Sequence, residues 1–279
     1  MTKKSKITSS SSLMNKEKII FFGNGPLADF SLKTLSKHFD IIFHAKEKSD
    51  LETVKSLKAA HPTAHGVLAS FGVMIKEDVL DLFEPEGILN IHPSLLPKYR
   101  GASPIESAIL NGDTDFSVSI MKLVKKMDAG PIYYQKTLKG LPLNKTIIYQ
   151  SLAEAGANWL VKNLTNLPTP TAQIEENATF TEKFDKTLSF LTPKLKSSDR
   201  LFREVIAFQG FPKSKYTFFD HECIILTAHT SDLAPTNPQS NLTLKCADNR
   251  FLVIDVLQPA GKKPMDWKSF LNGYKKPLS

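Results

Sequence analysis

Two side chains that can stabilise a developing negative charge lie close together in the stretch GILNIHPSLLPKYRGASP (residues 87–104). Asn90 and His92 end an apolar run and are separated by one residue. In a strand, residues i and i+2 point to the same face, so the amide and the imidazole project together. An amide N–H and an imidazolium N–H placed side by side can stabilise an oxyanion. The pair therefore predicts a catalytic site rather than a core position.

A carboxylate near His92 would favour the charged form of its imidazole. The candidate is Asp128, in the sequence MDAG, between two apolar segments at 116–123 and 131–138 that resemble strands. An aspartate shortly before a glycine is also an ordinary feature of turns. Spacing alone leaves both interpretations of Asp128 open.

The elements around these residues alternate along the chain. Short apolar runs predict strands, and the segments between them have helical spacing or helix-start signals; the strands lie at 18–23, 39–45, 67–71 and 87–92. A long helix is predicted over about 145–164. Such alternation predicts an α/β, Rossmann-like domain with a mostly parallel sheet and helices on both faces. Asn90 and His92 would then lie at the carboxyl end of a parallel strand, where ligands bind in such sheets.

Helix boundaries have local signals as well. Ser103 is predicted as an N-cap with Glu106 completing a capping box, Pro104 occupies the first helical position, and Gly112 ends the helix. Ser49, with a glutamate three residues later, predicts a second capping box.

Composition changes after the long helix. Residues 166–186 are rich in Pro, Thr and Asn, which predicts a flexible linker. One amphipathic helix and several short alternating strands follow, which predicts a small C-terminal β-barrel (OB-like) domain over 187–279. The predicted organisation is a disordered tail (1–17), a catalytic domain (18–165), the linker and the barrel.

The charge balance favours a polyanionic partner. Net charge is +8, and lysines or arginines that neutralise phosphates release counterions. Two cysteines are too few for a disulfide framework, and no apolar run approaches the roughly 20 residues that span a bilayer. We expect a cytoplasmic, monomeric protein that starts at Met1 or Met14 and has no membrane contact.

Two other motifs carry less weight. GNGPLA (residues 23–28) matches a dinucleotide fingerprint, but the second strand ends in His44 and Ala45 where an acidic residue should bind ribose. We interpret it as a tight turn. His61 and His65 have metal-ligand spacing, but Pro62 disfavours a helix there, and we predict no metal site.

The segments LNIHPSLLPKYRGASPI and MDAGPI together resemble the folate-dependent formyltransferases. That resemblance implies a catalytic trio of Asn90, His92 and Asp128, and 10-formyltetrahydrofolate as the formyl donor. It also implies two sets of folate contacts, namely Ser94, Leu95, Leu96 and Pro97 in one turn, and Phe71, Gly72, Val73 and Met74 around the pterin.

TFTEKFDK, REVIAFQGFP and LQPAGKKPM resemble the methionyl-tRNA formyltransferase branch of that family. This implies initiator methionyl-tRNA as the acceptor, with contacts from Arg100, Lys183, Lys186, Lys262 and Lys263. One departure is that the family's long, arginine-bearing loop after the second strand is almost absent. The alternatives are a sugar-nucleotide N-formyltransferase with the same donor, and a tRNA-binding protein without catalysis.

Overall fold

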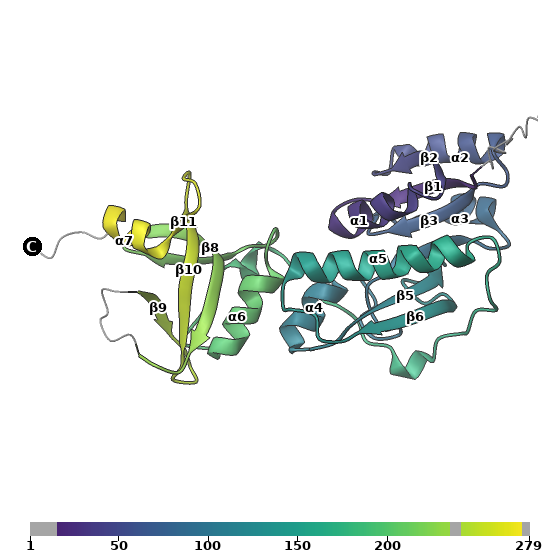
Figure 1. The fold of residues 1–279 in the computed structure, drawn as a ribbon. Helices are drawn as coiled ribbons and strands as arrows, with labels where there is room; N and C mark the ends of the chain where they lie inside the picture. Colours follow the sequence, from purple (N-terminus) through teal and green to yellow (C-terminus); the bar gives the residue numbers. More distant parts are fainter. Residues whose placement is uncertain (1–15, 235–240, 275–279) are drawn as a thin grey trace, which may run out of the picture.

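The computed structural model describes residues 16–234 and 241–274, which form two folded parts joined by a long connection (Figure 1). The predicted tail therefore lies outside the described residues except at positions 16 and 17. The first part contains six strands, which are β1 (Lys18–Gly23), β2 (Asp40–Ala45), β3 (His65–Ala69), β4 (Ile88–His92), β5 (Phe116–Lys122) and β6 (Ile132–Leu138). Its helices are α1 (Pro26–Leu35), α2 (Asp50–Ala60), α3 (Glu77–Leu80), α4 (Pro104–Asn111) and α5 (Lys145–Asn163).

The six strands form one sheet in the order β2-β1-β3-β4-β5-β6. Strands β2, β1, β3 and β4 are parallel, and β5 runs antiparallel to both of its neighbours. The predicted Rossmann-like α/β class is confirmed. Alternate residues of β1 enter different cores, because successive strand side chains point to opposite faces. Ile19 and Phe21 pack in the core with α1 and α5, whereas Ile20 and Phe22 pack in the core with α2 and α3.

The second part is a small curled antiparallel sheet. Its strands are β7 (Ser214–Phe218), β8 (His221–Ser231), β9 (Leu242–Lys245), β10 (Phe251–Pro259) and β11 (Met265–Asp266), with the order β11-β10-β8-β7 and β9 paired to β10. The predicted small C-terminal β domain is confirmed, as an open half-barrel within the described residues. Helix α7 (Trp267–Tyr274), which the sequence analysis did not predict, packs Phe270 into its core.

Helix α6 (Ser198–Ala207) contributes buried side chains to the hydrophobic cores of both parts. Leu201 and Val205 lie in the core of the second part, whereas Ile206 and Ala207 lie in the main core of the first. Arg200 adds a hydrogen bond from its Nη1 to the carbonyl of Leu110 at the end of α4, 3.0 Å long. Figure 1 shows α6 between the two sheets, oblique to α5 and close to its end.

Both predicted capping boxes are wrong, although the helices begin where expected. Neither Ser103 nor Ser49 makes a side-chain capping bond. Glu106 instead accepts one hydrogen bond from Tyr149 and pairs with Lys145, so tertiary contacts replace the local capping bond. The end of α4 is as predicted, because Gly112 adopts a left-handed conformation with φ 81°.

The linker is not a free tether. Thr171 pairs with Ile132 at the edge of the first sheet, and Thr179 accepts a 2.8 Å hydrogen bond from the backbone N–H of Arg100. Residues 171–181 therefore form part of the structure around the loop that follows β4. Within the described residues, no helix is long and apolar enough to cross a membrane.

Candidate active site

Asn90 and His92 lie at the carboxyl end of β4 and are 5% and 4% exposed, respectively. They line a cavity of about 500 Å³ together with the loop after β3 and the loop between β5 and β6. Leu89 and Ile91 point to the opposite face, into the core beneath α5. The alternation that the sequence predicted thus puts both polar side chains on one face.

The Asn90 side chain is only 5% exposed, and its amide faces the cavity. None of the hydrogen bonds among the described residues involves its side chain, although it faces the cavity. Its amide atoms are open to the cavity rather than enclosed in the core, so water or a ligand can make their hydrogen bonds. A ligand with an acceptor oxygen would satisfy this amide.

His92 is oriented by two contacts. Its Nε2 lies 3.1 Å from the carbonyl oxygen of Tyr99, and its Nδ1 lies 3.8 Å from Oδ1 of Asp128. A carbonyl oxygen only accepts, so Nε2 carries a hydrogen in this contact. The separation from Asp128 is too long for a hydrogen bond, but it places the carboxylate beside the imidazole, and both side chains are largely buried. The structure therefore brings the predicted trio into one cavity.

Asp128 reaches His92 because of two glycines. A side chain at Gly130 would lie 1.8 Å from the backbone oxygen of Lys122, so only glycine allows this close approach. Asp128 itself has φ 47°, a left-handed conformation that aspartate tolerates better than most residues. Gly101, with φ 115°, donates a 2.7 Å hydrogen bond from its N–H to Oδ2 of Asp128. This arrangement explains the MDAG and RGA sequences.

A linker residue that the sequence analysis missed holds the Asp128 loop from outside. Gln173 donates from Nε2 to the carbonyl oxygens of Asp128 and Gly130, at 2.8 and 2.7 Å. Its own carbonyl oxygen accepts from Nε and Nη2 of Arg100, at 3.1 and 2.9 Å. Since one amide makes four hydrogen bonds, its orientation is fixed. No local pattern could have revealed this contact across the chain.

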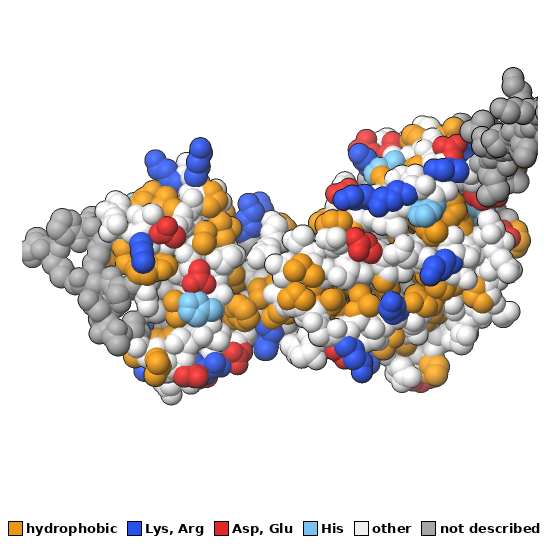
Figure 2. All heavy atoms as spheres, in the orientation of Figure 1, with side chains coloured by type: hydrophobic (Ala, Val, Ile, Leu, Met, Phe, Trp, Pro, Cys, Tyr) orange, Lys and Arg blue, Asp and Glu red, His pale blue; other side chains and the backbone are white. Residues whose placement is uncertain are grey.

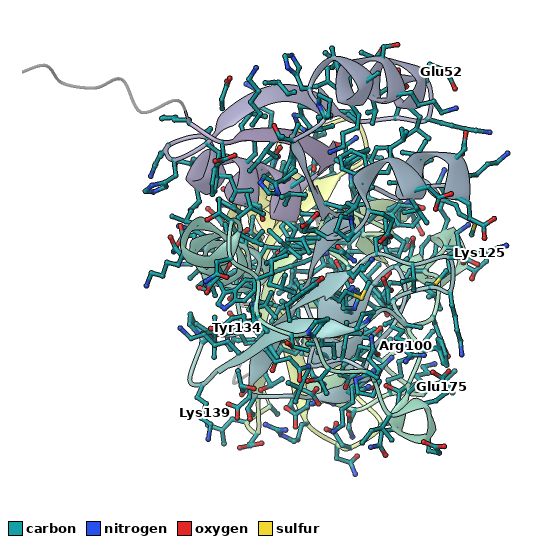
Figure 3. The ribbon with its side chains drawn as sticks, turned by 90° about the vertical axis from the view of Figure 1, so that its right-hand side faces the viewer. Glu52, Arg100, Lys125, Tyr134, Lys139 and Glu175 are labelled. Carbon is teal, nitrogen blue, oxygen red and sulfur yellow. The ribbon has the colours of Figure 1, made fainter. Side chains whose placement is uncertain are left out.

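Arg100 is fully buried (0% exposed), so its predicted contact with tRNA is wrong. Its guanidinium bonds to Gln173 and to Glu175, whose carboxylate also accepts from Lys126. Hydrogen bonds from Lys126 and then from Arg100 lower the pKa of Glu175. Figure 3 shows Arg100 and Glu175 next to each other at one side of the first part. A guanidinium that is fully buried and held in this way is not accessible to a phosphate backbone.

Replacing Arg100 with methionine should lower the free energy of unfolding by about 1.5–3 kcal/mol, the usual effect of losing hydrogen bonds to a charged group. Glu175 is half exposed, so water can solvate its carboxylate once the guanidinium is gone. Chemical denaturation followed by circular dichroism measures the change. Arg250→Met is the matched control, because Arg250 is partly exposed and its partners lie at the surface. Equal stabilities of the two variants would contradict the structural role of Arg100.

The two predicted sets of folate contacts have different locations. Phe71, Gly72, Val73 and Met74 line the cavity that holds the trio. Ser94, Leu95, Leu96 and Pro97 do not. Ser94 and Leu96 are buried, and Ser94 and Leu95 border a separate hollow of about 430 Å³.

This 94–97 turn is fixed by Ser119 of β5. Its hydroxyl donates to the Ser94 carbonyl at 2.7 Å and accepts from the Leu96 N–H at 3.1 Å. The turn thus positions the loop between β4 and α4, and its contacts with folate stay a prediction.

The predicted basic contacts other than Arg100 are exposed. Lys183 and Lys186 lie in the linker, and Lys262 and Lys263 lie in the turn between β10 and β11. Figure 2 shows basic side chains projecting above the second part at this hairpin. Among the described residues, no group of three or more His, Cys, Asp or Glu side chains could hold a metal ion. His61 ends α2, and His65 begins β3, so they do not share a helix.

Two family models match the chain. One, described as formyl transferase, covers residues 5–164, and another, described as formyl transferase, C-terminal domain, covers residues 195–275. This chain belongs to the formyl transferase family. A relative, the methionyl-tRNA formyltransferase of Dictyoglomus turgidum, is 32% identical over 267 residues, which cover 90% of this chain and 82% of the relative. The formyl transferase is therefore an enzyme, as the sequence predicted.

Solved structures share the fold of this formyl transferase. One is WlaRD, a sugar 3N-formyl transferase solved in the presence of dTDP and 5-N-formyl-THF, with a TM-score of 0.63 at 16% identity. The match covers 89% of this chain and 99% of the WlaRD chain. HypX from Aquifex aeolicus, in complex with tetrahydrofolic acid, has a TM-score of 0.69 at 15% identity. The match covers 94% of this chain, which spans about half (48%) of the HypX chain.

Proposed function

We propose that this enzyme transfers the formyl group of 10-formyltetrahydrofolate to the free amino group of methionyl initiator tRNA, in the cytoplasm. The observation that carries the proposal is the Asn90 amide, which faces the cavity beside the pair of His92 and Asp128. Such a site suits a reaction in which a carbonyl oxygen becomes an oxyanion.

The reaction follows from the positions of these groups. The neutral amine attacks the formyl carbon, and the electrons of the carbonyl π bond move to oxygen and create an oxyanion. Asn90 and the Nδ1–H of an imidazolium at His92 donate hydrogen bonds to that oxygen, since Nε2–H already donates to the Tyr99 carbonyl. Asp128 accepts the proton that the attacking amine loses, directly or through a water molecule. The intermediate collapses when the bond between the formyl carbon and N10 of the folate breaks and N10 takes up a proton.

The cavity around the trio supports a folate donor. Phe71, Val73, Leu123 and Met127 give it an apolar wall, while the strand end provides the polar groups. Cofactor sites combine apolar walls with a few convergent polar groups in this way. The folates named with HypX and WlaRD are consistent with such a donor.

The acceptor is supported by relatives and by charge. The Dictyoglomus turgidum relative acts on methionyl-tRNA according to its name, and it matches both parts of the chain. The net charge of +8 and the exposed lysines of the linker and hairpin suit a phosphate backbone.

A sugar nucleotide is the second candidate acceptor, because one observation favours it. Strand β2 passes into α2 through four residues only, 46–49, which leaves no long loop to enter an RNA helix. WlaRD also has the same two-part layout. An assay that offers charged initiator tRNA and nucleotide-linked amino sugars side by side distinguishes the two. Transfer to the amino sugar alone would overturn the tRNA proposal.

Replacing Lys183, Lys186, Lys262 and Lys263 together with alanine should weaken tRNA binding and flatten its dependence on salt. Each phosphate contact contributes about 0.7–0.9 to the slope of log K against log[salt], so the loss of four lowers the slope by roughly 3. Binding measured at several salt concentrations tests this.

The matched control for these four changes removes the same charge elsewhere. Lys33, Lys37, Lys136 and Lys139 are exposed lysines of α1, β6 and their flanks, and their replacement should leave most of the slope intact. Equal slopes for both quadruple variants would mean that net charge alone governs binding, and would remove the second part from the tRNA contact.

A further inference from the structure

The linker segment 171–181 contacts both loops that carry or orient the catalytic side chains. One loop follows His92 at the end of β4, and the other joins β5 to β6 and contains Asp128. The segment is anchored at the edge of the first sheet, where Thr171 and Ile132 exchange two backbone hydrogen bonds of 2.8 Å. In Figure 1 the linker leaves the end of α5 and runs back past β6 towards the second part. One short stretch of chain therefore borders both loops.

Gln173 bridges these two loops through opposite ends of its amide. Nε2 donates to the carbonyl oxygens of Asp128 and Gly130 in the loop between β5 and β6. Oε1 accepts from the guanidinium of Arg100, which lies in the loop after β4. Asp128 has φ 47°, a conformation that costs free energy for a residue with a side chain and persists only where the surroundings hold it. The two hydrogen bonds from Gln173 contribute to holding it.

Thr179 makes the corresponding contacts with the loop after β4. Its Oγ1 accepts a 2.9 Å hydrogen bond from the N–H of Tyr99. Its backbone accepts from the N–H of Arg100 and donates to the carbonyl of Pro97, at 2.8 and 3.1 Å. Tyr99 also has a left-handed conformation, with φ 59°, and its carbonyl oxygen is the partner of Nε2 of His92. Thr179 therefore holds the group that orients the His92 ring.

The spacing between His92 and Asp128 depends on the relative position of the two loops. Nδ1 and Oδ1 are 3.8 Å apart, slightly more than the length of a hydrogen bond, so a small shift of either loop makes or removes a direct contact. Displacing a catalytic group by about 1 Å can lower a rate by about 100-fold. Contacts that fix both loops at once therefore bear directly on the rate.

We propose that Gln173 and Thr179 are positioning residues for formyl transfer, which set the distance between the His92 imidazole and the Asp128 carboxylate from the linker. The inference rests on the proposed function, which gives these two catalytic side chains their roles. Neither linker residue lines the catalytic cavity, so neither touches a ligand bound there. Their replacement therefore lowers kcat and leaves folate affinity nearly unchanged.

Gln173→Glu separates positioning from general stability. The glutamate keeps oxygen acceptors for Arg100 but lacks the N–H donors to the carbonyls of Asp128 and Gly130. We expect kcat at saturating donor and acceptor to fall by about 10- to 100-fold, with little change in the Kd for folate or in the denaturation midpoint. Gln150→Glu is the matched control, because Gln150 is exposed on α5 and lies outside the cavity. A normal kcat in Gln173→Glu would overturn the proposal.

Thr179 allows a test with a conservative variant. Thr179→Val removes the hydroxyl that accepts from Tyr99, whereas Thr179→Ser retains it, and the backbone contacts are the same in both. We expect kcat to fall by about 10-fold in the valine variant, because the His92 ring loses its fixed orientation, and to recover in the serine variant. Equal rates for the two variants would show that the Thr179 hydroxyl has no part in positioning.

A double-mutant cycle determines whether Gln173 acts through Asp128. In an Asp128→Asn background the carboxylate is already gone, so adding Gln173→Glu should lower kcat by less than about twofold. Additive losses would overturn the positioning role. If Asp128→Asn alone turned over normally, the proposed mechanism itself would fail and the inference with it, so the two failures are distinguishable. All rates are measured with the acceptor that the wild type formylates, so the result is the same test for a tRNA or an amino sugar.

Discussion

His92→Ala should lower kcat by about 100- to 1,000-fold, the effect of removing one preorganised donor to an oxyanion, and Asn90→Ala should do the same. Both side chains lie in the same cavity at the end of β4, and the Asn90 amide has no partner among the described residues. Single-turnover formyl transfer at saturating donor and acceptor measures the loss.

Asn90→Asp makes this prediction sharper, because aspartate has the same shape but lacks the N–H donors. Its carboxylate would repel the oxyanion, so the loss should be at least as large as in Asn90→Ala. His44→Ala is a matched control, since His44 also lies near the end of a parallel strand but outside the cavity, with Nε2 2.9 Å from the Gly23 carbonyl. A near-normal kcat in either Asn90 variant would overturn its assignment as an oxyanion donor.

Asp128→Asn should lower kcat by about 100-fold or more while folate affinity changes little. An asparagine oxygen can still accept the hydrogen bond from Gly101, so the loop keeps its position. The negative charge beside His92 and the proton acceptor for the amine are both lost, and general base catalysis typically contributes about 100- to 10,000-fold. Folate titration and rate measurements on the same sample separate binding from turnover.

Asp113→Asn is the control for this second prediction. Asp113 accepts a hydrogen bond from the Tyr99 hydroxyl on the other side of the loop, at 2.9 Å, and does not border the catalytic cavity. Its kcat should stay near that of the wild type. A variant of Asp128 that binds folate poorly but turns over at the normal rate would make Asp128 a binding residue, and the proton acceptor would have to be sought elsewhere.

The sequence was most informative where a local rule decides the structure. The alternation in LNIH correctly placed Asn90 and His92 on one face, because neighbouring strand residues must point in opposite directions. Gly112 was correctly predicted as the end of α4, because few other residues adopt its left-handed conformation without strain. The position of Asp128 became meaningful only through the resemblance to a family.

Prediction failed where distant residues compete for the same groups. The bonds of Arg100 run to residues 73 and 75 positions later in the chain, so its burial could not be inferred from the basic turn around it. Glu106 likewise pairs with Lys145 and accepts a hydrogen bond from Tyr149, both of α5, instead of capping the start of its own helix. A local sequence pattern indicates which hydrogen bonds and ion pairs a side chain can form, and tertiary packing determines which of them do form.

Helix α6 has a mechanical consequence for the acceptor. Because its residues are buried in both cores and Lys145 ties its carboxyl end to α5, the two parts cannot rotate about it without exposing apolar surface to water. The spacing between them is therefore set before any acceptor arrives. An acceptor that must contact both parts therefore has to change its own conformation. The free energy of that conformational change is a property of the substrate, because the spacing between the two parts of the enzyme stays the same.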